Sequence, residues 1–487
     1  MKTRHRHPVV ASCGLMLAAS LFGGGLALVP SVGGSAAATL GAAATFSGPV
    51  TGGHVIEPIS VQPTGIAAHG YVEQEFFASG TAVAFHSTST PRDGKWKITA
   101  ATSAPYRTRV LVRRPSNPAR FSGTVVVEWM NVTAGESAPD WDYANPALMD
   151  AGDAWVGISV QAVAVEGGTP LLGSPGGGGN QGLVQQEPAR YGTLHHPGDR
   201  YALDMFEQIG LGLHAPHGAD VFGPLHPRHV VAAGESQSAF YLTTYADALQ
   251  PRSHAYDGIF IHSRDGSGAP LNSSSLLSGS LAGGLRIRTD LGVPVFMFET
   301  QTDVTLLGYA SAQQPDTRGI RTWEVAGTAH ADSYLIGPYV GALGCQSEVN
   351  MGPQHVVVEA ALQDLVTWVV HGTPPPSPPP FSVERKPSTL ARDSNGNVIG
   401  GVRTPAVDVP VSTLSEVAPT GSSVICTLFG STAAFTPSTL ASLYGSKANY
   451  IAKYTADLDR AIAERYLLPS ERASLLAQAQ QVQFPAG

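Results

Sequence analysis

Hydrophobic residues in this 487-residue chain gather in short continuous runs, most of them rich in β-branched and small side chains. Such runs are typical of strands buried on both faces of a parallel sheet. The predicted strands are residues 123–129, 154–160, 230–233, 256–262, 293–298 and 319–325. Helical patterns occupy residues 140–150, 199–213, 237–249 and 354–371. This alternation predicts an α/β fold with a mostly parallel central sheet and helices on both faces.

The region before the first of these runs has a different pattern. Residues 71–80, 96–99 and 106–115 are predicted as antiparallel strands. In the third of them polar and apolar residues alternate, which is typical of an edge strand. Long glycine-rich or serine-rich loops are predicted at residues 167–182 and 271–284, where they could border a site.

A proline-rich stretch, residues 373–380, separates the α/β pattern from a tail. Such a stretch forms a stiff, extended link. We therefore expect a catalytic body at residues 39–372 and a C-terminal segment at 381–487 that packs on it. The tail ends in helical patterns, one of which places Ile451, Tyr454, Leu458 and Ile462 on one face.

The N-terminus has the pattern of a secretory signal peptide. Lys2, Arg4 and Arg6 precede an apolar stretch at residues 9–29, and small residues at 35–38 resemble a cleavage site. A transmembrane anchor is the alternative, but a triple glycine within the apolar stretch favours a cleaved leader. We expect residues 1–38 to be removed and the protein to be secreted without a stable membrane anchor.

Removal of this leader changes the net charge from −8 to −11, because it takes away three basic and no acidic residues. An acidic chain without Lys/Arg clusters argues against nucleic acid as a partner. Of the three cysteines, Cys345 and Cys426 remain after cleavage, and in a secreted chain we expect them to form a disulfide. Two buried free thiols are the alternative. No metal-binding motif occurs, so no metal or cofactor is expected.

The candidate chemistry begins at Ser236, between the strand at 230–233 and the helix at 237–249. Gly234 and Ser238, two residues to either side, are small. A nucleophile elbow needs this pattern, because the sharp turn strains the serine backbone and leaves no room for larger neighbours. With Ser238 in place of glycine, the motif is one residue short of G-x-S-x-G. An ordinary turn with a helix-capping serine is the alternative.

Two further residues follow later strands. Asp303 comes after the strand at 293–298, and His330 comes after the strand at 319–325. Serine, acid and histidine in this chain order, each at a strand end, predict a Ser236–His330–Asp303 catalytic triad. Glu299 is an alternative acid, but it directly follows Phe298, whereas Asp303 lies further along the loop that must reach His330.

These motifs resemble the α/β-hydrolase superfamily, and within it a family of bacterial, often secreted, alpha/beta hydrolase domain proteins. The resemblance covers nearly the whole chain from residue 46. It is carried by residues 71–77, 127–132, 196–202, 234–238, 323–330 and 351–372. It implies the α/β-hydrolase fold and the triad, but no particular substrate.

The predicted function is cleavage of carboxylic esters, small or polymeric, by a secreted serine hydrolase through an acyl-enzyme. The oxyanion hole needs two N–H donors. We expect them from Gln237 and from Asn131, although Asn131 also begins an N-glycosylation sequon. An acyltransferase with the same triad and a non-catalytic binding protein with a hydrolase-like fold remain alternatives.

Overall fold

The computed structural model describes residues 41–60, 65–170, 181–272, 283–341, 343–346, 348–385 and 389–485, all of which belong to one compact unit, Ala37–Gly487. The predicted leader lies outside these ranges. Residues 171–180 and 273–282, which make up most of the two predicted loops, also lie outside them.

A ten-stranded sheet in the described part of the chain has the order β10-β9-β8-β7-β4-β5-β3-β2-β1-β6. Its strands are β1 (Thr45–Ser47), β2 (Tyr71–Ser87), β3 (Ile98–Pro115), β4 (Thr124–Trp129), β5 (Ala154–Ile158), β6 (His217–Gly218), β7 (His229–Glu235), β8 (Gly258–His262), β9 (Val295–Thr300) and β10 (Ile320–Val325). The strands from β10 to β5 are parallel to one another, and β1 to β3 join them antiparallel. The predicted mostly parallel sheet is confirmed.

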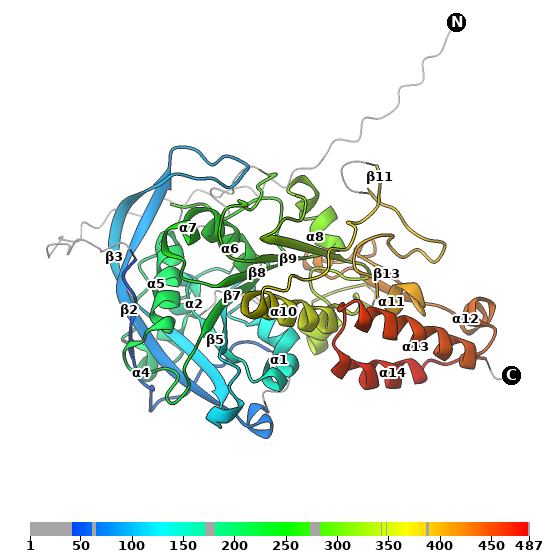
Figure 1. The fold of residues 1–487 in the computed structure, drawn as a ribbon, viewed down its shortest axis with the longest axis horizontal. Coiled ribbons are helices and arrows are strands. Elements are labelled where there is room, and N and C mark those ends of the chain that lie inside the picture. The colour runs from blue at the N-terminus through cyan, green and yellow to red at the C-terminus, as the bar shows by residue number, and fades with distance from the viewer. Residues whose placement is uncertain are drawn as a thin grey trace, which may run out of the picture. The chain divides into compact units, whose positions relative to one another are not determined.

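Helices cover both faces of this sheet (Figure 1). α1 (Pro139–Ala151) and α10 (Gln354–His371) pack together on one face, where α10 also contacts β7, β8 and β9. α5 (Ala202–His214), α6 (Gln237–Ala248) and α7 (Gln250–Ser253) lie on the other. α10 has the predicted bounds because Gly372 ends it in the left-handed conformation, at φ 69°. The shorter helices of the body are α2 (Ala162–Val165), α3 (Leu183–Gln186), α4 (Pro188–Tyr191), α8 (Gln301–Thr305) and α9 (Ser333–Ile336).

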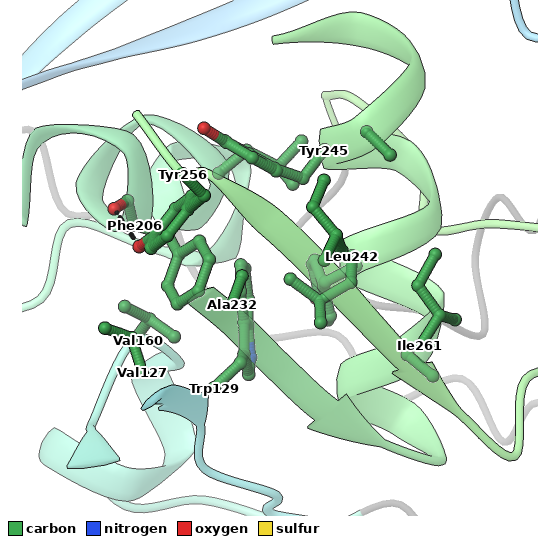
Figure 2. Packing of buried hydrophobic residues seen from close by; sticks show 14 of the residues in the cluster. Val127, Trp129, Val160, Phe206, Ala232, Leu242, Tyr245, Tyr256 and Ile261 are labelled. Atoms are coloured by element: carbon green, nitrogen blue, oxygen red, sulfur yellow. Dashed lines mark hydrogen bonds between the residues drawn. The ribbon is translucent and has the colours of Figure 1, made fainter. Parts of the chain in front are cut away.

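Buried aromatic rings fix α5 and α6 against the sheet (Figure 2). Trp129 at the end of β4 stacks on Tyr241 of α6, with 4.6 Å between ring centroids. Phe206 of α5 stacks on Tyr256 at 4.7 Å and meets Tyr245 edge-on at 5.6 Å. Each such pair contributes about 0.5–1.5 kcal/mol beyond the burial of its surface. The packing therefore holds α6 rigidly at the end of β7.

The prediction of an edge strand at residues 106–115 is wrong. These residues belong to β3, which starts at Ile98, includes part of the second predicted strand, and lies between β2 and β5. Two of its arginines are buried in ion pairs: Arg109 contacts Glu75 and Glu136, while Arg113 donates to Glu73 at 2.7 Å. Alternation of polar and apolar residues shows only that one face of a strand is polar. In β3 the charged groups on that face are paired with other charged groups and not exposed to solvent.

The C-terminal segment packs against the β10 side of the sheet, at the right of Figure 1. It contains the helices α11 (Pro405–Asp408), α12 (Pro437–Tyr444), α13 (Lys447–Ala463) and α14 (Arg472–Gln480), and the short strands β11 (Val383–Arg385), β12 (Thr389–Leu390), β13 (Ser412–Ser415) and β14 (Ser431–Ala434). The predicted disulfide between Cys345 and Cys426 is present. No helix in the described ranges is both long and apolar enough to cross a bilayer.

Candidate active site

Ser236 occupies a sharp turn between β7 and α6. Its backbone has φ 57° and ψ −117°, a conformation that is strained for any residue with a side chain. A Cβ atom added to Gly234 would lie 3.0 Å from the Cβ of Ser238, which explains why both neighbours are small. The Ser236 side chain makes no capping hydrogen bond to α6. The alternative of an ordinary capping serine therefore does not describe this turn.

A continuous chain of hydrogen bonds joins Ser236, His330 and Asp303. The Oγ atom of Ser236 lies 2.7 Å from Nε2 of His330, and Nδ1 of His330 lies 2.6 Å from Oδ1 of Asp303. The other carboxylate oxygen of Asp303 accepts hydrogen bonds from the N–H and the hydroxyl of Thr300, both at 2.7 Å. This geometry allows the imidazole to take a proton from Ser236 while the carboxylate fixes its orientation.

The buried Asp303 and His330 stabilise each other's charged forms. Burial alone would lower the pKa of His330, but the Asp303 carboxylate and, to a lesser extent, Glu235 raise it above its ordinary value. Burial alone would raise the pKa of Asp303, but His330 and the Thr300 hydrogen bonds lower it. An imidazolium at this position is thus stabilised, as base catalysis by His330 would require.

Glu299, the alternative acid, makes no hydrogen bond to His330. It lies within β9, fully buried, and neither carboxylate oxygen has a hydrogen-bond partner among the described residues. Burial, together with the nearby Asp303 charge, raises its pKa well above the ordinary value, which favours the neutral form of this carboxyl. Asp303 is the acidic residue that meets the imidazole.

The oxyanion donors are placed differently from the expectation. Gln237 is the first residue of α6, so its N–H has no acceptor within the helix and lies beside Ser236. The N–H of Asn131, the expected second donor, is already bonded to the carbonyl of Ser137 at 2.9 Å. Its side chain is buried and bonded to Glu235, which also leaves no room for a glycan.

The N–H of Val132 is the remaining candidate for the second oxyanion donor in this loop. The preceding Asn131 contacts Glu235, and the following Thr133 donates from its hydroxyl to the side chain of Gln237 at 3.3 Å. Val132 thus lies between two residues that contact the neighbours of Ser236. Its own N–H has no acceptor among the described residues, whereas the N–H of Thr133 is bonded to Asn131. The sequence did not reveal that the N–H of Asn131 is used within the structure, because the short pairing of Asn131 with Ser137 is a tertiary feature.

Two polar residues of the site were not predicted from the sequence. Glu235, just before Ser236, is buried and places Oε1 at 3.7 Å from Nε2 of His330. Its position inside the elbow motif was visible, but the direction of its side chain was not. Gln301, at the start of α8, accepts a hydrogen bond from the N–H of Gly327 at 2.6 Å and donates to Glu416 at 2.8 Å.

Gln301 connects the site to the C-terminal segment. Glu416, the acceptor for Gln301, is itself held by Arg392 at 2.6 Å. On the other side of the histidine loop, the N–H of Ala331 donates to the carbonyl of Leu428, close to the disulfide. Asp303 lies in α8 and not in a loop as expected, and residues 392–428 support both α8 and the loop that carries His330.

Comparison with known proteins identifies the family. The model of a protein family described as "Alpha/beta hydrolase domain" matches residues 46–477. The chain belongs to this family. Its sheet, with Ser236, Asp303 and His330 after three parallel strands or in the loops that follow them, is the α/β-hydrolase fold that the sequence predicted.

Solved structures similar to this hydrolase include esterases. A glucuronoyl esterase from Solibacter usitatus is 10% identical, with 58% of this chain and 81% of that chain covered and a TM-score of 0.28. Est1E from Butyrivibrio proteoclasticus, with ferulic acid bound, is 10% identical over 54% and 96% of the two chains, with a TM-score of 0.29. An α/β serine hydrolase without lid from Xanthomonas campestris is 11% identical over 50% and 83%, with a TM-score of 0.24. No curated protein matches the chain.

Proposed function

We propose that this α/β hydrolase is a serine esterase that cleaves carboxylic esters through an acyl-enzyme intermediate. The observation that carries the proposal is the hydrogen-bonded chain from Ser236 through His330 to Asp303. The strained serine at its end supports the same interpretation, because it presents Oγ at the tip of the turn. The family to which the chain belongs supports hydrolysis as the reaction class.

In the proposed reaction His330 Nε2 removes the proton from Ser236 as Oγ attacks the ester carbonyl. The same proton then passes to the leaving alcohol, which departs and leaves an acyl group on Ser236. Water, whose proton passes to His330, then attacks the acyl carbonyl; as the bond to Oγ breaks, His330 returns the proton to Ser236 and the carboxylic acid is released. Throughout, Asp303 keeps the imidazole in the required tautomer and stabilises its charged form.

The negative charge on the carbonyl oxygen needs stabilisation in both steps. We assign this role to the backbone N–H groups of Gln237 and Val132. Neither N–H has an acceptor among the described residues, and Asn131 and Thr133, which flank Val132, contact Glu235 and Gln237, which flank Ser236. Each such donor contributes on the order of 10²–10³-fold in rate in enzymes of this type.

We further propose that the enzyme works outside the cell. The pattern of residues 1–38 is that of a signal peptide. The disulfide between Cys345 and Cys426 supports an oxidising compartment. An extracellular ester, either a small molecule or a side group of a polymer, is the substrate that fits this location.

Two measurements on the purified protein test the proposal. A fluorophosphonate probe followed by peptide mapping should label Ser236 and leave Ser238 unmodified. A series of p-nitrophenyl esters of increasing chain length should be hydrolysed with a burst of p-nitrophenol that matches the enzyme concentration when deacylation is slow. Labelling at another serine would refute the assignment. A competing alcohol in the same assay, with product analysis, separates hydrolysis from acyl transfer.

A further inference from the structure

Glu235 places a second carboxylate beside the histidine, on the side opposite Asp303. Its Oε1 atom lies 3.7 Å from Nε2 of His330, the nitrogen that is hydrogen-bonded to Ser236 Oγ. Its Oε2 atom accepts a hydrogen bond from Nδ2 of Asn131 at 3.1 Å, and the same nitrogen donates to the Glu235 carbonyl at 3.1 Å. Asn131 thus fixes the glutamate and leaves Oε1 next to the reacting nitrogen.

We propose that Glu235 is a positioning residue of the site, whose carboxylate stabilises the imidazolium of His330 from the Nε2 side. The inference rests on the proposed function and deepens it. In the transition state Nε2 gains a proton, and the positive charge of the ring then lies between Asp303 at Nδ1 and Glu235 near Nε2. Because both carboxylates are buried, their attraction to this charge is only weakly screened.

The surroundings of Glu235 determine when its charge is present. Charged or titratable groups face it from the histidine loop, β8, α1 and α8: His330, His262, Asp140, Tyr143 and Asp303. Burial raises the pKa of Glu235 to about 7, a rise opposed by the two histidines and reinforced by the two aspartates. Above that pH the carboxylate is charged and attracts the imidazolium; well below it the group is neutral.

The alternative is that Glu235 merely holds Asn131 in place. Its hydrogen bond to Asn131 uses Oε2, and an amide oxygen at the same position could accept it equally well. Charge at Oε1 is needed only for the effect on His330. Glu235→Gln therefore separates the two roles, because it keeps the volume and the acceptor but removes the charge.

The first test compares this variant with the wild type in two ways. In Glu235→Gln the pKa of His330, followed by NMR of the ring in the resting enzyme, should fall by about 1–3 pH units. The acid limb of kcat/KM should move to lower pH in parallel, and the rate on the plateau above pH 8 should fall about tenfold or more. A loss of rate with an unchanged His330 pKa, or no change in either quantity, overturns the proposal.

Glu299→Gln is the matched control. This glutamate is equally buried, but its carboxyl makes no hydrogen bond to any described residue, and burial raises its pKa, which favours the neutral form. The amide variant should leave the pKa of His330 and the acid limb where they are. A shift as large as that of Glu235→Gln would show that any buried substitution disturbs the imidazole, and would overturn the specific role.

If Glu235→Gln fails to fold, Glu235→Asp decides the question. It keeps the charge but withdraws it by one methylene, so the pKa of His330 should fall by less than about one pH unit. An unchanged or raised value overturns the proposal. The NMR measurement needs no substrate. If no ester is hydrolysed and Ser236 is not labelled, the proposed function fails, while the effect of Glu235 on His330 is still measured separately.

Discussion

Ser236 and His330 meet in one hydrogen bond, yet the two sides of that bond are held in different ways. On the nucleophile side, β7 and α6 are consecutive in the chain, and their packing positions the turn between them. On the acid and base side, Asp303 and His330 follow two separate strands. Gln301 joins α8, which carries Asp303, to the loop that carries His330, and residues 392–428 of the C-terminal segment contact both.

The two sides of the site therefore depend on the C-terminal segment to different extents. The elbow depends on the small side chains at positions 234 and 238 and on the packing of α6 against Trp129 and the strands beneath it, none of which belongs to the C-terminal segment, so changes in that segment should leave it intact. The distance between Asp303 and His330 depends on hydrogen bonds between segments 26 and 115 residues apart. Changes in the C-terminal segment should therefore lower activity through the histidine while the nucleophile stays in place.

The largest effect is expected from the nucleophile itself. Ser236→Ala should lower kcat by roughly 10⁴-fold or more, because no nucleophile is then left for the acyl-enzyme step. Ser238→Ala is the control: its hydroxyl is buried and has no hydrogen-bond partner among the described residues, so its loss should change kcat little. Steady-state kinetics with one p-nitrophenyl ester compares both variants. Full activity of Ser236→Ala would contradict the assignment.

Asp303→Asn should come next, with a loss of roughly 10⁴-fold in kcat, because the amide would favour the wrong imidazole tautomer. Its melting temperature, measured near neutral pH, should fall as well. The pKa of Asp303 is depressed in the folded state, so its contribution to stability is present above the ordinary pKa and is lost as pH falls through the folded value.

The comparison variant is Glu299→Gln, which should keep most of the activity. For Asp303→Asn itself, the difference in melting temperature from the wild type should shrink as the solution is acidified, because protonation of Asp303 removes the same charge from the wild type. A fully active Asp303→Asn together with an inactive but folded Glu299→Gln would reverse the choice of acid.

Removal of the disulfide should act on the histidine side. The double variant Cys345→Ala, Cys426→Ala opens a loop of 81 residues, so it should lower the free energy of unfolding by about 2–5 kcal/mol. Because Leu428 near the disulfide holds Ala331, activity should be lost on heating before the circular dichroism of the sheet and helices changes. Simultaneous loss of both signals at the wild-type temperature would show that the disulfide does not support the histidine loop.

The smallest effect concerns Gln301. Gln301→Leu leaves the N–H of Gly327 and the carboxylate of Glu416 without this partner, at a cost of about 1–3 kcal/mol. We expect kcat to fall about tenfold, while phosphonate labelling of Ser236 slows less, because the elbow is untouched.

Gln314→Leu is the matched control for this prediction. Gln314 also bridges backbone groups, the N–H and C=O of Ile287, and these lie outside the loops that carry the triad. The variant should lower stability without lowering kcat. Equal effects of the two variants on kcat would remove Gln301 from the support of the site.

The sequence by itself determined the elements whose pattern is local. The buried strands could be predicted from continuous apolar runs, the bounds of α10 from its helical pattern and Gly372, and the elbow from Gly234 and Ser238. It also limited the disulfide to Cys345 and Cys426, since these are the two cysteines beyond the predicted leader. These features depend on side-chain size, polarity and backbone preference within a few residues.

Only the tertiary structure decided which polar groups meet. It placed β3 inside the sheet, where glutamates from other segments pair with its arginines. In it the N–H of Asn131 donates to the carbonyl of Ser137, whereas the N–H of Val132 has no acceptor among the described residues. It also brought Glu235 to His330. A hydrogen bond or ion pair depends on distance and direction between segments far apart in the chain, and a local pattern of residues contains neither.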